Sequence, residues 1–169
     1  MTSVTYSEIF SRFYLKVEAY DLFDSSVTDE MRNDFLCGYL HSAISKPYTR
    51  RLFSSIQYTD TDIYEDVEGT IEFTMKYSVD DNADEDFVKE ILAMGMVLEW
   101  VEPKVKSLTH MRRMISTSDE KFYAESTFLT SLMSLQESTE AAQKNLIDIR
   151  GFINNDYLDG NAATASLRS

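Results

Sequence analysis

The chain has a single thiol, Cys37, and His41 follows it at the spacing of one helical turn. On a helix the two side chains would share a face, where a thiol and an imidazole can act as nucleophile and base. Such a pair also needs an orienting group and a pocket, and two ligands are too few for a zinc site. Cys37 is more simply a small apolar residue beside a helix core. We therefore expect no catalytic residue and no enzymatic activity.

A short acidic run, Asp80, Asn82 and Asp84, has the spacing of positions 1, 3 and 5 of a calcium-binding EF-hand loop. Such a loop requires glycine at position 6 and glutamate at position 12, where this chain has Glu85 and Ile91. Capping of a following helix explains these carboxylates more simply. The sequence has no glycine-rich phosphate loop and no zinc-protease or serine-hydrolase motif. We therefore expect no metal site and no cofactor.

The composition is that of a globular protein with a core. The 169 residues suggest one domain, with 43% hydrophobic and 27% charged residues. There are 16 Lys and Arg against 29 Asp and Glu, a formal net charge of −13, which disfavours nucleic acid as the main ligand. The most apolar stretch, 87–101, contains Lys89, Glu90 and Glu99 and is too short and too charged to cross a bilayer. With no visible secretion signal, we expect a protein assembled in the cytoplasm.

Hydrophobic periodicity predicts a mainly α fold, a helical bundle of about four to five helices with a short β-hairpin or long loop inserted. The first helix is expected at 6–22, where Thr5 and Glu8 form a capping box. The second is expected at 28–46, and a proline then begins a shorter helix at 47–54.

A longer helix is predicted from Asn82 to about Val101. Its apolar residues lie on nearly all sides, as in the central helix of a bundle. Gly95 in its middle costs about 1 kcal/mol of helix propensity relative to alanine, so we expect a close helix contact there. Trp100 and Pro103 mark its end or a kink.

The last helix is predicted to begin after Thr117 and to reach Arg150. At about 32 residues it would be roughly 48 Å long, against a diameter of roughly 40 Å for a compact chain of this size. It either projects and needs a partner, or breaks near Ser138-Thr139 and folds back. Its apolar residues recur about every 3.5 positions and predict a seam for another helix. They are Phe122, Leu129, Leu132, Leu135, Ala142, Leu146 and Ile149.

Residues 69–79 alternate between apolar and polar side chains, which predicts a half-buried strand. A lone strand is unstable, so it needs a partner. Residues 55–58 could form a hairpin with it, or a neighbouring subunit could supply a strand. We expect one domain at 1–158, with an acidic loop and β insertion at about 55–81, and a flexible tail at 159–169.

Charge is distributed unevenly along the chain. The segment 60–86 contains eleven acidic residues and one basic residue, Lys76. The main basic cluster has no acid within it and comprises Lys104, Lys106, Arg112 and Arg113. Such separation suits contact between unlike faces of two copies, with Asp80 and Asp81 as candidate partners of the basic cluster. The alternatives are a solvated acidic loop beside an unrelated basic surface, or pairing of the two segments within one copy.

Four stretches carry a family resemblance. They are SAISKPYTRRLF at 42–53, KYSVDD at 76–81, GMVLEWVEPKV at 95–105 and FINNDYL at 152–158. Together they resemble the head–tail connector (adaptor, or neck) proteins of tailed bacteriophages, and the match covers most of the chain. The resemblance implies a small helical bundle that carries a β-hairpin or long loop and acts as a viral structural protein.

The resemblance also implies partners and a location. Connectors of this kind form a ring of about twelve copies below the portal, by a head-to-tail contact that closes. The ring extends the DNA channel, through which DNA passes without sequence-specific binding. The implied partners are other copies, the portal protein and a downstream neck or tail-completion protein, in the neck of the virion and without a membrane. In related connectors the C-terminal segment docks on the portal, which corresponds here to Phe152, Ile153, Tyr157 and Leu158.

The strong net charge supports a second interpretation from another class. An acidic protein can mimic DNA and inhibit a host nucleic-acid enzyme. The clustering of acids in one segment fits this interpretation less well than acids spread over the surface would.

Overall fold

The computed structural model describes residues 2–18, 20, 27–59, 69–114 and 120–153, and it leaves the side chains of 111–114, 120–125, 152 and 153 undescribed. These residues form three strands and five helices, so the predicted mainly α fold with a small β insertion is confirmed. The elements are β1 (Thr2–Thr5), α1 (Tyr6–Val17), α2 (Asp29–Ser45), α3 (Pro47–Arg50), β2 (Phe53–Thr59), β3 (Thr70–Met75), α4 (Asp81–Met114) and α5 (Glu120–Ile153).

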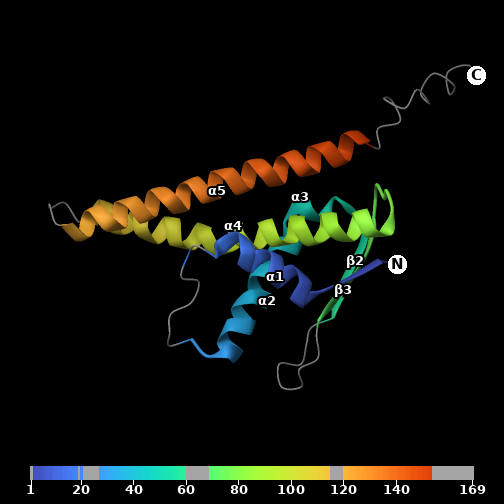
Figure 1. The fold of residues 1–169 in the computed structure, drawn as a ribbon, viewed down its shortest axis with the longest axis horizontal. Coiled ribbons are helices and arrows are strands. Elements are labelled where there is room, and N and C mark those ends of the chain that lie inside the picture. The colour runs from blue at the N-terminus through green and yellow to red at the C-terminus, as the bar shows by residue number, and fades with distance from the viewer. Residues whose placement is uncertain (1, 19, 21–26, 60–68, 115–119, 154–169) are drawn as a thin grey trace, which may run out of the picture.

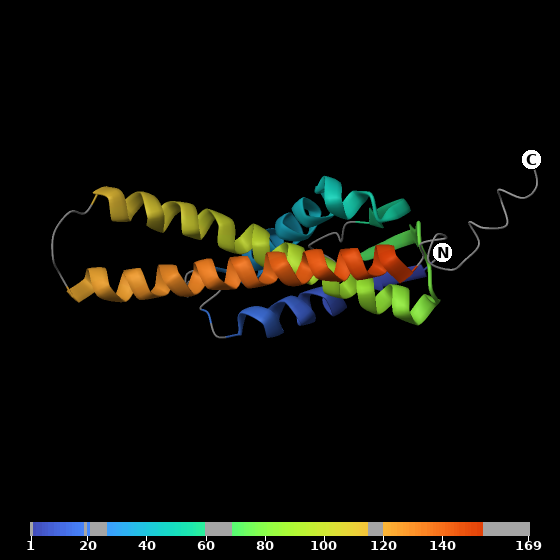
Figure 2. The same cartoon turned by 90° about the horizontal axis from the view of Figure 1, so that it is seen from above.

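An antiparallel pair of long helices, α4 and α5, defines the long axis of the molecule (Figures 1 and 2). Each has 34 residues. At 1.5 Å per residue each is about 51 Å long. α5 continues through Ser138 and Thr139 without a break. It does not project alone, because α4 is equally long and lies beside it.

The sequence predicted that α4 ends or kinks near Trp100 and Pro103. It does not end there, because the helix continues through Pro103 to Met114. Proline cannot donate to the carbonyl of Glu99, and inside a helix it costs about 3 kcal/mol. Pro103 is exposed, so its ring does not disturb the packing against α5. Contact with α5 stabilises the second half of α4, as tertiary packing does for most helices in proteins.

The three strands form one antiparallel sheet in the order β1–β3–β2. β2 and β3 form the predicted hairpin, with Ile56 opposite Phe73. β1 was not predicted; it pairs with the other edge of β3 and places Val4 opposite Ile71. The strand expected at 69–79 is shorter, and both of its neighbours come from the same chain. A neighbouring subunit is therefore not needed to complete the sheet.

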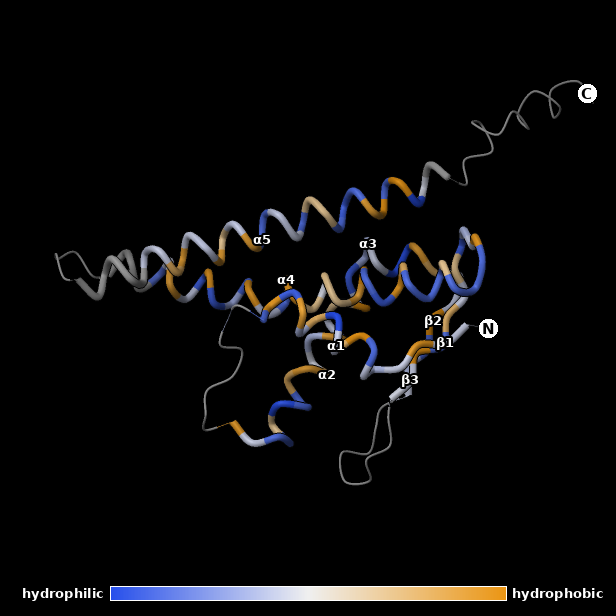
Figure 3. Tube along the Cα trace, in the orientation of Figure 1, coloured by the Kyte–Doolittle hydropathy of each residue, from blue (hydrophilic) through white to orange (hydrophobic). Residues whose placement is uncertain are grey.

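The core lies where α1, α2 and the sheet pack against the first half of α4. All residues of 91–98 are buried, which confirms α4 as the central helix. The close helix contact expected at Gly95 is also confirmed, because a Cβ there would lie 2.7 Å from the Cβ of Ala43 in α2. Colouring by hydropathy shows that apolar and polar residues alternate along both long helices (Figure 3).

Helix caps explain where several helices begin. The Thr5–Glu8 capping box is present at α1, with 3.0 Å between the Thr5 N and Glu8 Oε2. α4 begins at Asp81, one residue before the expected Asn82, and its cap is Asp80: the Asp80 Oδ1 accepts from the Ala83 N–H at 2.9 Å. The expected cap at Thr117 and the tail at 159–169 lie outside the described residues. None of the described helices combines the length and apolar content needed to span a membrane.

Candidate functional site

The environment of His41 is aromatic. Its Nε2 lies 3.1 Å from the Tyr6 Oη, and its ring stacks on Tyr58 with 4.5 Å between centroids. Cys37 is half-buried and packs against the core. The imidazole thus joins α1, α2 and β2.

The acidic run at the start of α4 has structural partners. Asp84 is 2% exposed; its Oδ1 accepts from the Val79 N–H at 3.2 Å and forms an ion pair with Arg150. The Arg150 Nε donates to the carbonyl oxygen of Tyr77 at 3.3 Å. Burial lowers the pKa of the Arg150 guanidinium. This network fastens the end of α5 to the beginning of α4. The described residues contain no group of three or more side chains that could hold a metal ion.

The seam of α5 is more polar than the sequence predicted. Ile149, expected in the seam, is 46% exposed. Among the described side chains of α5, the buried ones are Leu129, Leu132, Thr139, Gln143, Ile147 and Arg150. Successive steps of seven residues after Leu129 lead to Gln136, which is half-buried, and to Gln143 and Arg150, which are buried. The heptad repeat is therefore present, although its later members are polar. Sequence reasoning missed them because glutamine and arginine in a helix usually face solvent.

The basic cluster occupies the second half of α4. The Lys104 Nζ lies 5.2 Å from the centroid of the Trp100 ring, within the range of a cation–π contact. The Lys106 Nζ lies 2.5 Å from the Glu102 Oε1, one turn away. Arg112 and Arg113 are in the last turn of α4, and their side chains are not described. Part of the positive charge is therefore compensated within the helix.

The acidic residues near the start of α4 also have neighbours of opposite charge. Asp86 pairs with Arg12 at 2.5 Å, and Glu90 pairs with Lys16 at 2.5 Å. Asp81 Oδ1 accepts from the Thr2 hydroxyl at 3.0 Å. Five of the eleven acids of the segment 60–86 lie at 60–68, outside the described residues.

The candidate contact residues are far apart within one copy. Asp80 and Asp81 lie at the beginning of α4, and Lys104 follows 23 residues after Asp81 on the same helix. At 1.5 Å per residue the separation is about 35 Å, and it is larger for Arg112 and Arg113. Asp80 and Asp81 therefore do not pair with the basic cluster inside one chain, whereas the acids at 60–68 of the same segment lie outside the described residues.

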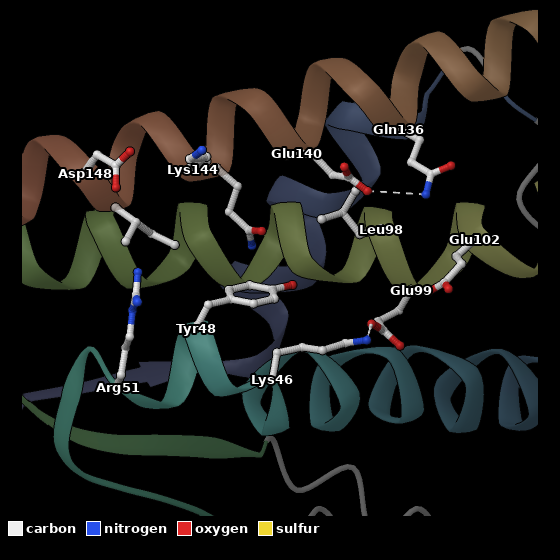
Figure 4. A pocket seen from close by; sticks show the side chains of 12 residues that line it. Lys46, Tyr48, Arg51, Leu98, Glu99, Glu102, Gln136, Glu140, Lys144 and Asp148 are labelled. Carbon is white, nitrogen blue, oxygen red and sulfur yellow. Dashed lines mark hydrogen bonds and ion pairs between the residues drawn. The ribbon is translucent and has the colours of Figure 1, made fainter.

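Two grooves adjoin one another beside α5. One, of about 500 Å³, lies between α5, α4 and α3, with Tyr48 at its centre (Figure 4). Lys46 and Glu99 form an ion pair of 2.7 Å on its lower side, and this hydrogen bond raises the pKa of Lys46. Burial raises the pKa of the Tyr48 phenol. The other, of about 600 Å³, lies at the end of α5 and shares Arg51, Ile147 and Asp148 with the first.

The expected docking residues are only partly described. Phe152 and Ile153 are the last residues of α5, next to Gly151, which lines the second groove. Their side chains are not described, and Tyr157 and Leu158 lie outside the described residues.

Comparisons with models of protein families, with curated proteins and with solved structures find no match for this chain.

Proposed function

We propose that this protein is a structural head–tail connector of a tailed bacteriophage, which forms a ring below the portal, extends the DNA channel and joins head to tail. The four resembling stretches support this family. The single structural observation that carries the proposal is that the candidate acidic residues lie at the beginning of α4 and the basic cluster lies in its second half.

A contact between opposite parts of the same helix in two copies is heterologous when each copy uses its acidic end for one neighbour and its basic cluster for another. A reciprocal antiparallel contact would instead give a closed dimer. Repetition of the heterologous contact produces a closed ring when the rotation between copies closes, and a filament when it does not. In this proposal Asp80 and Asp81 of one copy face the basic cluster of the next. Charge complementarity would fix the register and speed the encounter.

The proposed role is geometric and not chemical. The long α4–α5 pair spans the molecule and can place a contact at each end (Figure 1). We propose about twelve copies in the ring, to match a portal. The other partners are the portal, with Phe152, Ile153, Tyr157 and Leu158 as docking residues, and a downstream neck or tail-completion protein. The protein would reside in the neck of the virion and act without cofactor or catalysis.

The test is the mass of the protein with and without purified portal protein, followed by electron microscopy of particles assembled without it. We expect a complex of fixed stoichiometry with the portal, and DNA-filled heads that lack tails. Tailed, infectious particles that contain none of this protein would overturn the proposal.

The alternative function, a DNA mimic, requires a row of carboxylates that remain open to a host enzyme. Among the described residues, Asp84, Asp86 and Glu90 pair with basic side chains of the same chain, so this part of the surface does not favour it. Competition of the purified protein with DNA for a host enzyme would favour the mimic over the connector.

A further inference from the structure

The groove at the end of α5, called the end groove here, lies where the last turns of α5 pass over β3 and the link between α3 and β2. Its volume is about 600 Å³. Its lining residues are Arg51, Leu52, Met75, Lys76, Tyr77, Ile147, Asp148, Arg150 and Gly151.

The end groove combines an apolar floor with three basic side chains and one acidic side chain, Asp148. Leu52, Met75 and Ile147 form the floor and keep 6 to 8% of their surface exposed. Figure 4 shows Arg51 extending from the end of α3 toward α5. Neither Arg51 nor Lys76 has an ion pair among the described residues, whereas Arg150 is engaged by Asp84. Such a lining suits a segment that has aliphatic or aromatic side chains next to carboxylates.

The chain leaves α5 at the edge of this groove. Gly151 lines it, and the helix ends two residues later at Ile153. The next three residues, 154–156, are Asn-Asn-Asp, which are types that tight turns prefer. Tyr157 and Leu158 follow, with Asp156 and Asp159 on either side. Five extended residues span about 17 Å, enough to return to a groove that begins at Gly151.

We propose that the end groove is the docking site of residues 154–159 of the same chain. The segment turns back after α5, places Tyr157 and Leu158 on the apolar floor, and brings Asp156 and Asp159 near Arg51 and Lys76. Because both partners belong to one chain, docking needs no second molecule and is independent of the proposed function. An external partner that requires this segment would have to displace it from the groove first.

The test is intramolecular disulfide formation in the full chain, with Cys37→Ala as background. One protein carries Tyr77→Cys at the groove and Gly160→Cys just after the docking segment. The control carries Gly160→Cys and Asn82→Cys, an exposed position in the first turn of α4, which lies near the end of α5 but does not line the end groove. Under mild oxidation at low protein concentration, we expect the groove pair to form its bond at least about tenfold faster, since docking raises the local concentration of the two thiols. Mass analysis of the peptides identifies the bond.

Further substitutions separate docking from chance encounter. Arg51→Glu or Leu158→Ser in the groove pair should lower the rate to that of the control. Lys144→Glu, a cation of α5 outside the end groove, should leave it unchanged. Equal rates for the groove pair and the control would overturn the proposal. Bonds that form only between two chains, faster as concentration rises, would also overturn it and assign the groove to a second copy.

Hydrogen exchange checks the same contact without cysteines. In the chain with Tyr157→Ser and Leu158→Ser, amides of 75–77 and 147–151 should exchange faster than in the original chain, and those of β1 should not change. Unchanged exchange at 75–77 and 147–151 would contradict the proposal.

Discussion

The side-chain amide of Gln143 in α5 donates a hydrogen bond to the carbonyl oxygen of Ile91 in α4, with 3.0 Å between Nε2 and O. Gly95 lies one turn further along α4, and a Cβ there would be 3.5 Å from the Gln143 Nε2 and 2.7 Å from the Cβ of Ala43. Three helices, α2, α4 and α5, thus meet at one residue without a side chain. The contact explains how a polar residue can occupy the seam of α5.

Replacement of Gln143 tests the strength of this contact. Gln143 is 4% exposed, so Gln143→Ala removes a buried hydrogen bond and leaves a cavity between the helices. We expect a loss of about 1–3 kcal/mol in the free energy of unfolding, measured by urea denaturation. Asn145→Ala, on the exposed side of α5, is the control and should change stability by less than about 0.5 kcal/mol. Equal losses in the two variants would show that the amide is not a significant contact.

A methyl group at Gly95 should separate α2 from α4. Gly95→Ala gains helix propensity, but the new Cβ would lie 2.7 Å from that of Ala43. Overpacking of this kind costs about 1–3 kcal/mol, so we expect a lower melting temperature. Gly38→Ala is the matched control, because Gly38 lies within α2 and a Cβ there would meet no neighbouring element within 4 Å. It should gain about 0.5–1 kcal/mol. A stabilised Gly95→Ala protein would contradict the close packing.

The buried ion pair between Asp84 and Arg150 should be sensitive to loss of one partner. Arg150→Met leaves the Asp84 carboxylate uncompensated, and we expect a loss of about 3–5 kcal/mol in unfolding free energy. The double variant with Asp84→Leu should recover part of this loss. Lys106→Ala, which breaks the exposed pair with Glu102, should cost at most about 1 kcal/mol. If the double variant were as unstable as Arg150→Met, the loss would not come from the unpaired Asp84 carboxylate, and the prediction would be wrong.

The capping carboxylate of Glu8 predicts a pH dependence of stability. Hydrogen bonds from Lys89 and from the Thr5 N–H lower the pKa of Glu8 from its usual 4.5 to about 2. A lowered pKa in the folded state contributes stability that is present above pH 4.5 and is lost as the pH falls toward 2. Glu8→Gln keeps the cap without the charge, so its deficit in unfolding free energy should shrink between about pH 5 and about pH 2.5.

Lys89→Met is the companion to Glu8→Gln, because its Nζ lies 2.6 Å from the Glu8 Oε1. Its deficit should shrink over the same pH range. Urea midpoints at each pH measure both variants, and a deficit that stays constant would contradict the assignment to Glu8.

The proposed ring predicts an effect of charge reversal at the end of α4. Arg112→Glu with Arg113→Glu would place acids opposite Asp80 and Asp81 of the next copy, so we expect loss of ring formation and ordinary thermal stability of the single chain. Rings of the original protein should also weaken as salt is raised, since exposed charges are screened. Electron microscopy and mass measurement report both effects. Unimpaired rings from the reversed variant would remove this contact from the proposal.

Much of the fold follows from local patterns in the sequence. Three local patterns predicted an element each: the capping box at Thr5 predicted the start of α1, the proline at 47 predicted the start of α3, and the alternation at 69–79 predicted β3. Each pattern strongly favours one local conformation. β1 was missed, since four residues carry too little periodicity to distinguish a strand from an extended terminus. The length of α4 was missed because packing against α5 outweighs the cost of Pro103, which a local pattern does not show.

The candidate site was less predictable than the fold. The sequence separated the acidic and basic residues correctly, but it could not place them at the beginning and in the second half of one helix while Pro103 was expected to end it. Gln143 gave no signal, because its burial depends on the space that Gly95 leaves. Arg51 and Ile147 come together only through the packing of α5 over the link between α3 and β2.

The antiparallel course of α4 and α5 returns the chain to where it began. β1 and the last turn of α5 lie at the same end of the molecule, and the last turn of α4 and the first turn of α5 lie at the other (Figure 1). An affinity tag or fluorescent protein fused directly before β1 or directly after α5 would therefore occupy the same end of the molecule. A protein inserted between the two long helices would occupy the opposite end of the molecule. Fusions at the two sites would thus report separately on which end has room for a bulky neighbour.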